Sequence, residues 1–329
     1  MSGKVTIQEA YLRNWYKSDV LSTSGWTRES ITPILDLAAK YKDCIQKGED
    51  ISVKTKSACL TLFYEPSTRT RLSFEAAANN LGVKVLNVAD AATDSSAFKG
   101  ETLEDTGRVI SAYADVVVVR HPEVGAAARV AATATIPVLN GGDGAGEHPT
   151  QALLDLFTIR EAFGRVEGLR VGFCGDLLNG RTVHSLLRLL LTLGCKVTAI
   201  SPDELAIPRE VLAKTPGAAD RVEVASDLKK VLPNLDVLYI TRVQKERFKD
   251  VQFYERVCKN YRLTKSDLAD ASSSLKILHP LPRVDELSPD IDSDPRAHYF
   301  VQAANGVPVR MALLTAVLGL KNDVSEGMT

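Results

Sequence analysis

The chain has 329 residues, of which 45% are hydrophobic and 25% charged, and its 40 basic and 41 acidic side chains leave a net charge of −1. This length predicts two domains, because a single hydrophobic core stops growing at about 250–300 residues. The balanced charge excludes a global field that would attract nucleic acid or an anionic membrane, so any anion site must be local.

Five cysteines are spread along the sequence: Cys44, Cys59, Cys174, Cys195 and Cys258. Their odd number and wide spacing, without a C-x-x-C or Cys/His cluster, exclude a disulfide framework and a zinc site. The amino-terminal segment has no apolar run of signal-peptide length, and the run SLLRLLLTLGC is short and carries Arg188. We therefore expect buried thiols in a cytoplasmic protein.

The first half of the chain alternates helical patterns with short apolar runs. An amphipathic segment places apolar side chains at helical spacing, at Ile31, Ile34, Leu35, Ala38, Tyr41 and Ile45. The runs that follow are ACLTLFY, KVLNVA, DVVVVR and IPVLN. Such near-continuous apolar runs are typical of parallel strands in a sheet that helices cover on both faces.

A second series of strand-like runs begins at LRVGFCGD and continues with KVTAIS, DVLYITR and LKILHPLP. We therefore predict an α/β protein of two domains, each a parallel sheet flanked by helices. Glycines and a proline in GGDGAGEHPTQ interrupt the pattern before the helical segment TQALLDLFTIREAF. This break places the boundary near residue 150, with one domain over 1–150 and the other over 151–304.

Polar clusters follow the predicted strands at their carboxyl ends, where open α/β sheets bind ligands. The cluster STRTR, residues 67–71, lies between a strand and the helical segment LSFEAAANNLG. A helix amino terminus offers free N–H groups and a partial positive charge, so this cluster favours a phosphate site. The alternative is a Ser/Thr helix cap beside two solvated arginines. Because Arg69 and Arg71 face different ways, we expect only one to reach a ligand.

The segment GDLLNGRT, residues 175–182, differs by one residue from the nucleotide-triphosphate loop G-x-x-x-x-G-K-[ST]. A triphosphate site would also need an Asp at the end of a neighbouring strand to hold Mg²⁺. DVLYITR ends instead in Thr241 and Arg242, with Asp236 at its other end. Arg181 in place of lysine favours a carboxylate. A P-loop nucleotide hydrolase is the less favoured alternative.

Two histidines stand beside prolines after predicted strands, in HPTQ and HPLP. His148 lies three residues before Gln151 in a glycine-bounded loop, where the two could contact a carbonyl oxygen and an amide. The remaining histidines are interpreted as ordinary polar residues: His121, His184 and His298.

Four arginines follow predicted strands: Arg69, Arg120, Arg181 and Arg242. The sequence shows no Ser-His-Asp set, no paired carboxylates and no activated cysteine beside them. The pattern indicates a site that binds anions and that would act through positioning and charge stabilisation.

Six segments resemble, in order and spacing, those of aspartate carbamoyltransferase catalytic chains: STRTR, RHP, HPTQ, GDLLNGRTVHSL, TRVQKER and HPLPRVDEL. The resemblance implies a carbamoyl-phosphate domain and an aspartate domain across a cleft, with a C-terminal helix over 305–320 returning to the first. It also implies a homotrimer without metal or organic cofactor. The implied reaction carbamoylates L-aspartate with carbamoyl phosphate, for pyrimidine biosynthesis.

The resemblance further implies roles for individual residues. Those that would hold the phosphate are Ser67, Thr68, Arg69 and Thr70. Those that would contact the carbonyl oxygen are Thr70, Arg120 and His148, with Arg120 also on the phosphate. The carbamoyl NH₂ would meet Gln151 and the backbone carbonyls of Pro280 and Leu281. The two carboxylates of aspartate would meet Arg181, Arg242 and Gln244.

The segment TDSSAFKGET resembles the family's mobile loop, whose serine and lysine, here Ser95 and Lys99, reach into the neighbouring subunit's site. In the implied reaction the neutral amine of aspartate attacks the carbamoyl carbon through a tetrahedral intermediate. Phosphate then leaves and can accept the amine proton itself, since no side chain is an obvious general base.

Ornithine carbamoyltransferases share the phosphate motif and are the nearest alternative. In them a cysteine follows the histidine of the last motif, where this chain has Pro280. Arg242 and Gln244 also favour a dicarboxylate substrate. The sequence leaves open whether regulatory chains bind and whether the chain is fused to other enzymes of pyrimidine synthesis.

Overall fold

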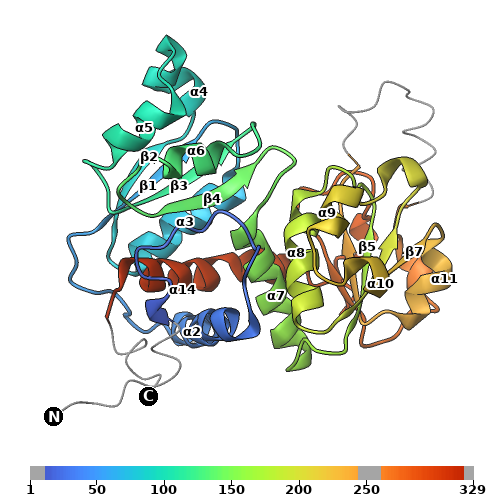
Figure 1. Ribbon diagram of the computed structural model, residues 1–329. Helices are drawn as coiled ribbons and strands as arrows, with labels where there is room; N and C mark the ends of the chain where they lie inside the picture. The colour runs from blue at the N-terminus through green and yellow to red at the C-terminus, as the bar shows by residue number, and fades with distance from the viewer. Residues whose placement is uncertain (1–11, 244–260, 322–329) are drawn as a thin grey trace. The chain divides into compact units, whose positions relative to one another are not determined.

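The computed structural model describes residues 12–243 and 261–321, and the chain divides into two compact units (Figure 1). Unit 1 runs to Phe157 and resumes at Asn305, and unit 2 comprises Thr158–Ala304. The division falls inside helix α7 (Pro149–Phe163) rather than in the glycine-rich segment before residue 150. After Pro149 this segment holds no glycine or proline, so the helix continues through the division.

Unit 1 contains a four-stranded parallel sheet in the order β2-β1-β3-β4. Its strands are β1 (Ala58–Phe63), β2 (Lys84–Val88), β3 (Val116–His121) and β4 (Val138–Asp143). The parallel sheet confirms the prediction, but β2 is an edge strand and all five of its side chains are exposed or half-buried. The apolar run KVLNVA is thus not buried on both faces, because β2 pairs with β1 on one side only.

Helices cover both faces of this sheet (Figure 1). Helices α5 (Leu103–Ile110) and α6 (Ala126–Ala131) form one buried cluster with alternate side chains of β1 and β3. Helices α2 (Arg28–Lys47), α3 (Thr68–Asn80) and α14 (Gly306–Leu318) pack together on the other side. Short α4 (Ala91–Asp94) and the 3₁₀ turn η1 (Ser96–Lys99) precede α5.

Helix α14 is apolar on every side, and nearly all of its residues are buried. Together with α13 (Tyr299–Ala304) it is long and apolar enough to cross a membrane by composition alone, but 72% of its most apolar window is buried within the protein. An all-round apolar helix of this kind is a core helix. Its contacts with α2 and α3 place the C-terminal segment in unit 1.

Unit 2 contains a five-stranded parallel sheet in the order β7-β6-β5-β8-β9. Its strands are β5 (Arg170–Cys174), β6 (Lys196–Ile200), β7 (Val222–Ala225), β8 (Val237–Ile240) and β9 (Lys276–Leu278). The sequence did not predict β7, which is a four-residue edge strand with no buried side chain. Among the described residues its α-helices include α8 (Arg181–Thr192), α9 (Arg209–Ala213), α10 (Ala218–Arg221), α11 (Leu228–Val231) and α13.

Candidate active site

Each sheet has a point where the strand order reverses, and ligands of open α/β sheets bind at the carboxyl ends of the strands there. In unit 1 this point lies between β1 and β3, and in unit 2 between β5 and β8. The segment STRTR follows β1, and Arg120 pairs with Phe63 across the β1–β3 ladder. Arg181 and Arg242 follow β5 and β8. The topology therefore collects the predicted polar clusters at one edge of each sheet.

The amino terminus of α3 is open toward an anion. Ser67 is the N-cap residue, yet its side chain makes no capping hydrogen bond, and the first turn contains no acidic residue. Thr68 and Arg69 are exposed, whereas Thr70 is buried. The alternative interpretation as a helix cap therefore does not describe Ser67, whose hydroxyl is not used by the helix.

The two arginines of STRTR differ in their surroundings. Arg71 lies on the surface of α3 with its Nη1 3.5 Å from Oε1 of Glu75, an i,i+4 pair. The side chain of Arg69 makes no ion pair within residues 12–243 and 261–321. Partial desolvation lowers the pKa of the Arg69 guanidinium, with no carboxylate acting against it. Arg69 is therefore the arginine that an incoming anion would meet.

Thr70 and His148 meet in the interior of unit 1. Thr70 Oγ1 lies 3.3 Å from His148 Nε2, and the two side chains are 5% and 3% exposed. Thr70 belongs to the first turn of α3, and His148 precedes α7. The fold thus joins a hydroxyl and an imidazole that are 78 residues apart in the sequence.

The side chain of Arg120 contacts a backbone oxygen and a carboxylate. Its Nη1 donates to the backbone oxygen of Gly141 at 3.0 Å, and its Nη2 lies 2.6 Å from Oε1 of Glu65. Glu65 lies between β1 and STRTR, and sequence reasoning did not assign it a role. An anion that binds Arg120 at Nη2 must compete with this carboxylate.

Gln151 donates its amide NH₂ to a buried carboxylate. Its Nε2 lies 2.8 Å from Oδ1 of Asp155, which is fully buried on α7. The spacing is i,i+4, so the helical prediction for TQALLD already contained the signal for this pair.

In unit 2, the loops after β5 and β8 are in close contact. Thr241 N donates to Cys174 O at 2.8 Å, and a Cβ on Gly175, whose φ is +117°, would clash with the backbone oxygen of Thr241. Arg181 and Arg242 are both half-buried at this edge. Gln244 lies outside the described residues.

The loop before α8 carries its own carboxylate. Buried Asp176 accepts hydrogen bonds from the backbone N–H and the side-chain amide of Asn179, at 3.0 and 3.2 Å. At the opposite end of β8, Asp236 pairs with Arg170 at 2.8 Å, and this ion pair lowers the pKa of Asp236. Asp236 is therefore not placed to hold Mg²⁺ for a nucleotide at GDLLNGRT, as the sequence predicted.

The HPLP turn after β9 is fixed by a buried His–Glu pair that sequence reasoning missed. His279 Nδ1 accepts from the backbone N–H of Leu281 at 2.8 Å, so its Nε2, 2.8 Å from Glu286 Oε1, carries the proton. Burial raises the pKa of Glu286, but the hydrogen bond and charge of His279, together with backbone N–H donors, lower that pKa overall. Leu281 has φ +55°, a strained conformation for a bulky residue. The pair therefore orients the carbonyls of Pro280 and Leu281.

Ser95 and Lys99 lie at the two ends of η1. Ser95 Oγ accepts from the backbone N–H of Ala97 at 3.1 Å, and Lys99 is exposed. Unit 1 alone does not join these two side chains to Thr70 or His148 through any hydrogen bond between described residues.

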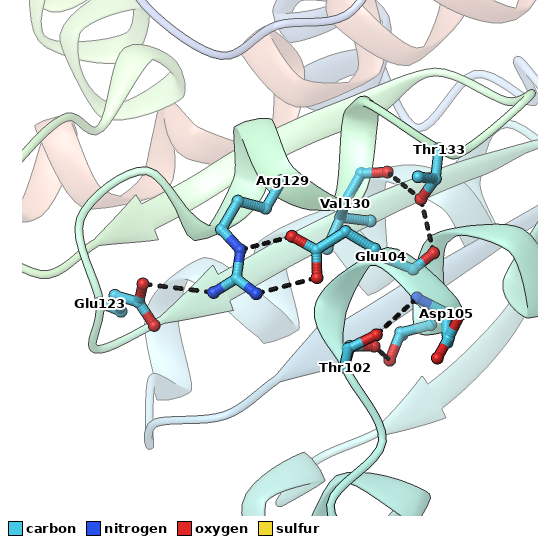
Figure 2. A network of polar contacts seen from close by, with 8 residues as sticks. Thr102, Glu104, Asp105, Glu123, Arg129, Val130 and Thr133 are labelled. Carbon is cyan, nitrogen blue, oxygen red and sulfur yellow. Dashed lines mark hydrogen bonds and ion pairs between the residues drawn. The ribbon is translucent and has the colours of Figure 1, made fainter.

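The helix that follows η1 is anchored by the network in Figure 2. Arg129 of α6 binds both carboxylate oxygens of Glu104 of α5, at 2.7 and 2.8 Å, and Thr133 Oγ1 donates to Glu104 O at 2.6 Å. The Arg129 guanidinium lowers the pKa of Glu104 to about 2. Because this pair is partly exposed to solvent, we expect it to fix geometry more than to add stability.

The chain is similar to known carbamoyltransferases over nearly its whole length. Residues 18–161 match the model of the "aspartate/ornithine carbamoyltransferase, carbamoyl-P binding domain", and residues 167–317 match its "Asp/Orn binding domain". The aspartate carbamoyltransferase catalytic subunit of Thermococcus onnurineus is 46% identical over 93% of this chain and 98% of its own length. The catalytic subunit of Chromobacterium violaceum is 46% identical over 92% of this chain and 98% of its own length.

Solved structures of aspartate transcarbamoylases are also similar to this chain. Aspartate transcarbamoylase from Trypanosoma cruzi in complex with N-(phosphonacetyl)-L-aspartic acid superposes with a TM-score of 0.88, at 38% identity over 93% of this chain and 97% of that one. The catalytic subunit of M. jannaschii aspartate transcarbamoylase superposes with a TM-score of 0.85, at 41% identity over 92% of this chain and 98% of that one.

Proposed function

Because the chain belongs to the aspartate/ornithine carbamoyltransferase family, we propose that it transfers the carbamoyl group of carbamoyl phosphate to the amine of L-aspartate. The products are N-carbamoyl-L-aspartate and phosphate, which makes the reaction a step of pyrimidine biosynthesis. The T. cruzi relative has been solved with both carbamoyl phosphate and aspartate bound, which supports this pair of substrates.

The buried hydrogen bond between Thr70 and His148 at the amino terminus of α3 carries the proposal. It places a hydroxyl and an imidazole beside free helix N–H groups, where a phosphate and an adjoining carbonyl oxygen would lie. The residues that hold the phosphate are Ser67, Thr68, Arg69 and Thr70. Arg120 moves from Glu65 to bridge the phosphate and the carbonyl oxygen. Charge on the tetrahedral intermediate is then stabilised by fixed donors.

The remaining groups orient the two substrates. Gln151 and the backbone carbonyls of Pro280 and Leu281 accept hydrogen bonds from the carbamoyl NH₂. The residues that bind the carboxylates of aspartate are Arg181, Arg242, Gln244 and Lys99. A pair of arginines after adjacent strands suits a dicarboxylate better than the cationic side chain of ornithine.

An assay of the ureido product tests the proposal. Purified enzyme is given carbamoyl phosphate with either aspartate or ornithine, and we expect product with aspartate. Product with ornithine alone would contradict it in favour of the sister enzyme. Magnesium-dependent ATP hydrolysis without carbamoyl transfer would favour the P-loop alternative.

We also propose a homotrimer in which Ser95 and Lys99 act in the neighbouring subunit's site. The resemblance of TDSSAFKGET to the family's mobile loop and the exposure of Lys99 support this arrangement. The relatives' name "catalytic subunit" supports separate regulatory chains as further partners.

Mixing two inactive variants tests the shared site. Lys99→Ala and Arg181→Ala trimers should each be nearly inactive, but every mixed ring contains one interface that joins an unmutated Lys99 to an unmutated Arg181. Random reassortment of equal amounts makes roughly three-quarters of rings mixed, each with one native site in three, so about a quarter of wild-type activity should return. Activity is measured after mixing, denaturing and renaturing, with each variant renatured alone as control. No gain over these controls, despite proven subunit exchange, would place Lys99 in its own chain's site or in none.

A further inference from the structure

Unit 1 contains a buried carboxylate that the proposed reaction does not use. Asp143 is the last residue of β4 and is 6% exposed. Its Oδ1 accepts from the backbone N–H of Glu147 at 2.7 Å and from the side-chain amide of Asn140 at 3.2 Å. Its Oδ2 accepts from the backbone N–H of Gly125 at 2.7 Å. A buried carboxylate needs such donors in place of water, so these contacts fix the side chain of Asp143.

The contacts of Asp143 close a turn that ends directly before His148. The backbone N–H of Asp143 donates to Glu147 O at 3.2 Å, and its backbone oxygen accepts from the N–H of Gly146 at 2.8 Å. On the other side, the backbone oxygen of His148 accepts from the N–H of Gln151, in the first turn of α7, at 3.1 Å. The backbone of His148 is therefore fixed between the turn and the helix.

The same turn packs against the loop between β3 and α6. Gly125, whose N–H donates to Oδ2 of Asp143, belongs to this loop as the N-cap residue of α6. A Cβ on Gly146 would lie 2.9 Å from Oδ1 of Asp143 and 2.9 Å from Cγ1 of Val124, a residue of the same loop. The turn therefore has no room for a side chain at Gly146. Asp143 thus holds the turn against a second segment of the candidate site, the one that follows β3.

We propose that Asp143 is a positioning residue, whose carboxylate fixes the turn before His148 and so holds the imidazole where it contacts the carbonyl oxygen of carbamoyl phosphate. The Nε2 of His148 lies 3.3 Å from Oγ1 of Thr70, so a shift of the turn moves the imidazole relative to this hydroxyl. The inference rests on the proposed function, in which Thr70, Arg120 and His148 contact that oxygen.

The physical basis is that both oxygens of Asp143 accept hydrogen bonds. An amide of the same shape accepts at one end and donates at the other. In Asp143→Asn the NH₂ group would therefore face the backbone N–H of either Glu147 or Gly125, and neither N–H can turn away. The variant keeps the side-chain volume but loses one anchor of the turn. Because donors to a developing charge must be fixed in place, a displacement of about 1 Å can cost about 100-fold in rate.

Steady-state kinetics of carbamoyl transfer to aspartate test the inference. We expect Asp143→Asn to lower kcat about tenfold, with KM for aspartate changed by less than about twofold because the proposed aspartate contacts lie elsewhere. The matched control is Asp115→Ala. It removes a carboxylate that accepts from the backbone N–H of Ala58 at 2.8 Å, at the amino ends of β1 and β3. This control should lower thermal stability with an unchanged kcat.

A double-mutant cycle shows whether Asp143 acts through His148. His148→Ala should itself have a strongly reduced kcat, because it removes a donor to the carbonyl oxygen. Adding Asp143→Asn to this variant should lower kcat by less than about twofold further, since the group that Asp143 positions is absent. A further fall of about tenfold, equal to the effect in the wild-type background, would show that Asp143 acts elsewhere and would overturn the inference.

Gly146→Ala decides the question if Asp143→Asn does not fold. Its added methyl group displaces the same carboxylate oxygen by steric contact, so kcat should fall in the wild-type background but not in His148→Ala. A wild-type kcat in the variant that folds would overturn the inference. Turnover by the wild type tests the proposed function separately. An active wild type with unchanged kcat in the variants would therefore refute only the role of Asp143.

Discussion

The amino termini of α3 and α8 occupy matching places, since each helix follows the strand at which the order of its sheet reverses. Neither N-cap residue, Ser67 or Gly180, makes a side-chain capping hydrogen bond. The two termini differ in the charge around them. The loop before α8 contains buried Asp176, which accepts from Asn179, whereas the loop before α3 contains Glu65, which is paired with Arg120, and the first turn of α3 adds hydroxyls and Arg69.

In the proposed function, this difference accounts for the binding of different anions at two similar helix ends. At α8 the carboxylate of Asp176 already accepts from the loop N–H of Asn179, and a polyphosphate would be repelled by it. At α3 the helix N–H groups, the hydroxyls and an arginine without an ion pair are left for a phosphate. One buried carboxylate therefore makes the amino terminus of α8 unfavourable for a polyphosphate, although GDLLNGRT is similar in sequence to a nucleotide-binding loop.

Removing the side chain of Arg69 should have the largest effect on activity. We expect Arg69→Ala to lower kcat by at least about 100-fold with the fold intact, because it deletes a charged contact in a site that acts by charge stabilisation. The matched control is Arg71→Ala, which removes only the surface pair with Glu75 and should keep nearly full activity. Steady-state kinetics and circular dichroism provide the measurements, and equal activity of the two variants would refute the assignment of Arg69.

Substitution of an arginine in unit 2 should change KM for aspartate more than KM for carbamoyl phosphate. Arg242→Ala should raise KM for aspartate by about 10- to 100-fold, since a hydrogen bond to a charged group contributes about 1.5–3 kcal/mol. KM for carbamoyl phosphate should change little. If both KM values rose equally, Arg242 would not be specific for aspartate.

Asp176 tests the contrast between the helix ends directly. Asp176→Asn should lower the free energy of unfolding by about 1–2 kcal/mol, because the variant weakens the hydrogen bonds to Asn179. Thermal denaturation provides the measurement. ATP binding by the wild type, seen by calorimetry, would contradict the view that this carboxylate excludes a polyphosphate.

Substitution of Glu65 should have the smallest effect, a change in the affinity for phosphate. In Glu65→Gln the neutral amide competes less with an anion for Nη2 of Arg120, so we expect inorganic phosphate to bind a few-fold more tightly. Titration calorimetry measures this affinity. Weaker phosphate binding in the variant would show that Glu65 holds Arg120 in its binding position instead of competing for it.

Much of this architecture could be predicted from periodicity and composition. The apolar runs at residues 58–63, 116–121 and 170–174 became strands because a buried parallel strand needs apolar side chains on both faces. The exposed edge strand β7 could not be predicted, because its four residues are exposed or half-buried and form too short a run to show an apolar pattern. The division inside α7 has no signature in the sequence, since a helix that runs through a boundary leaves no local break in the pattern.

The sequence by itself determined which chemical groups follow each strand: the hydroxyls and Arg69 after β1, His148 after β4, Arg181 after β5 and Arg242 after β8. Only the tertiary structure decided their partners. Thr70 with His148 and Arg120 with Glu65 are pairs between separate segments, and local pattern carries no information about contacts across the sheet. The order of the strands in each sheet sets those contacts. The strand order depends on how the helices bury their apolar faces, because apolar burial is non-directional and depends on the whole fold.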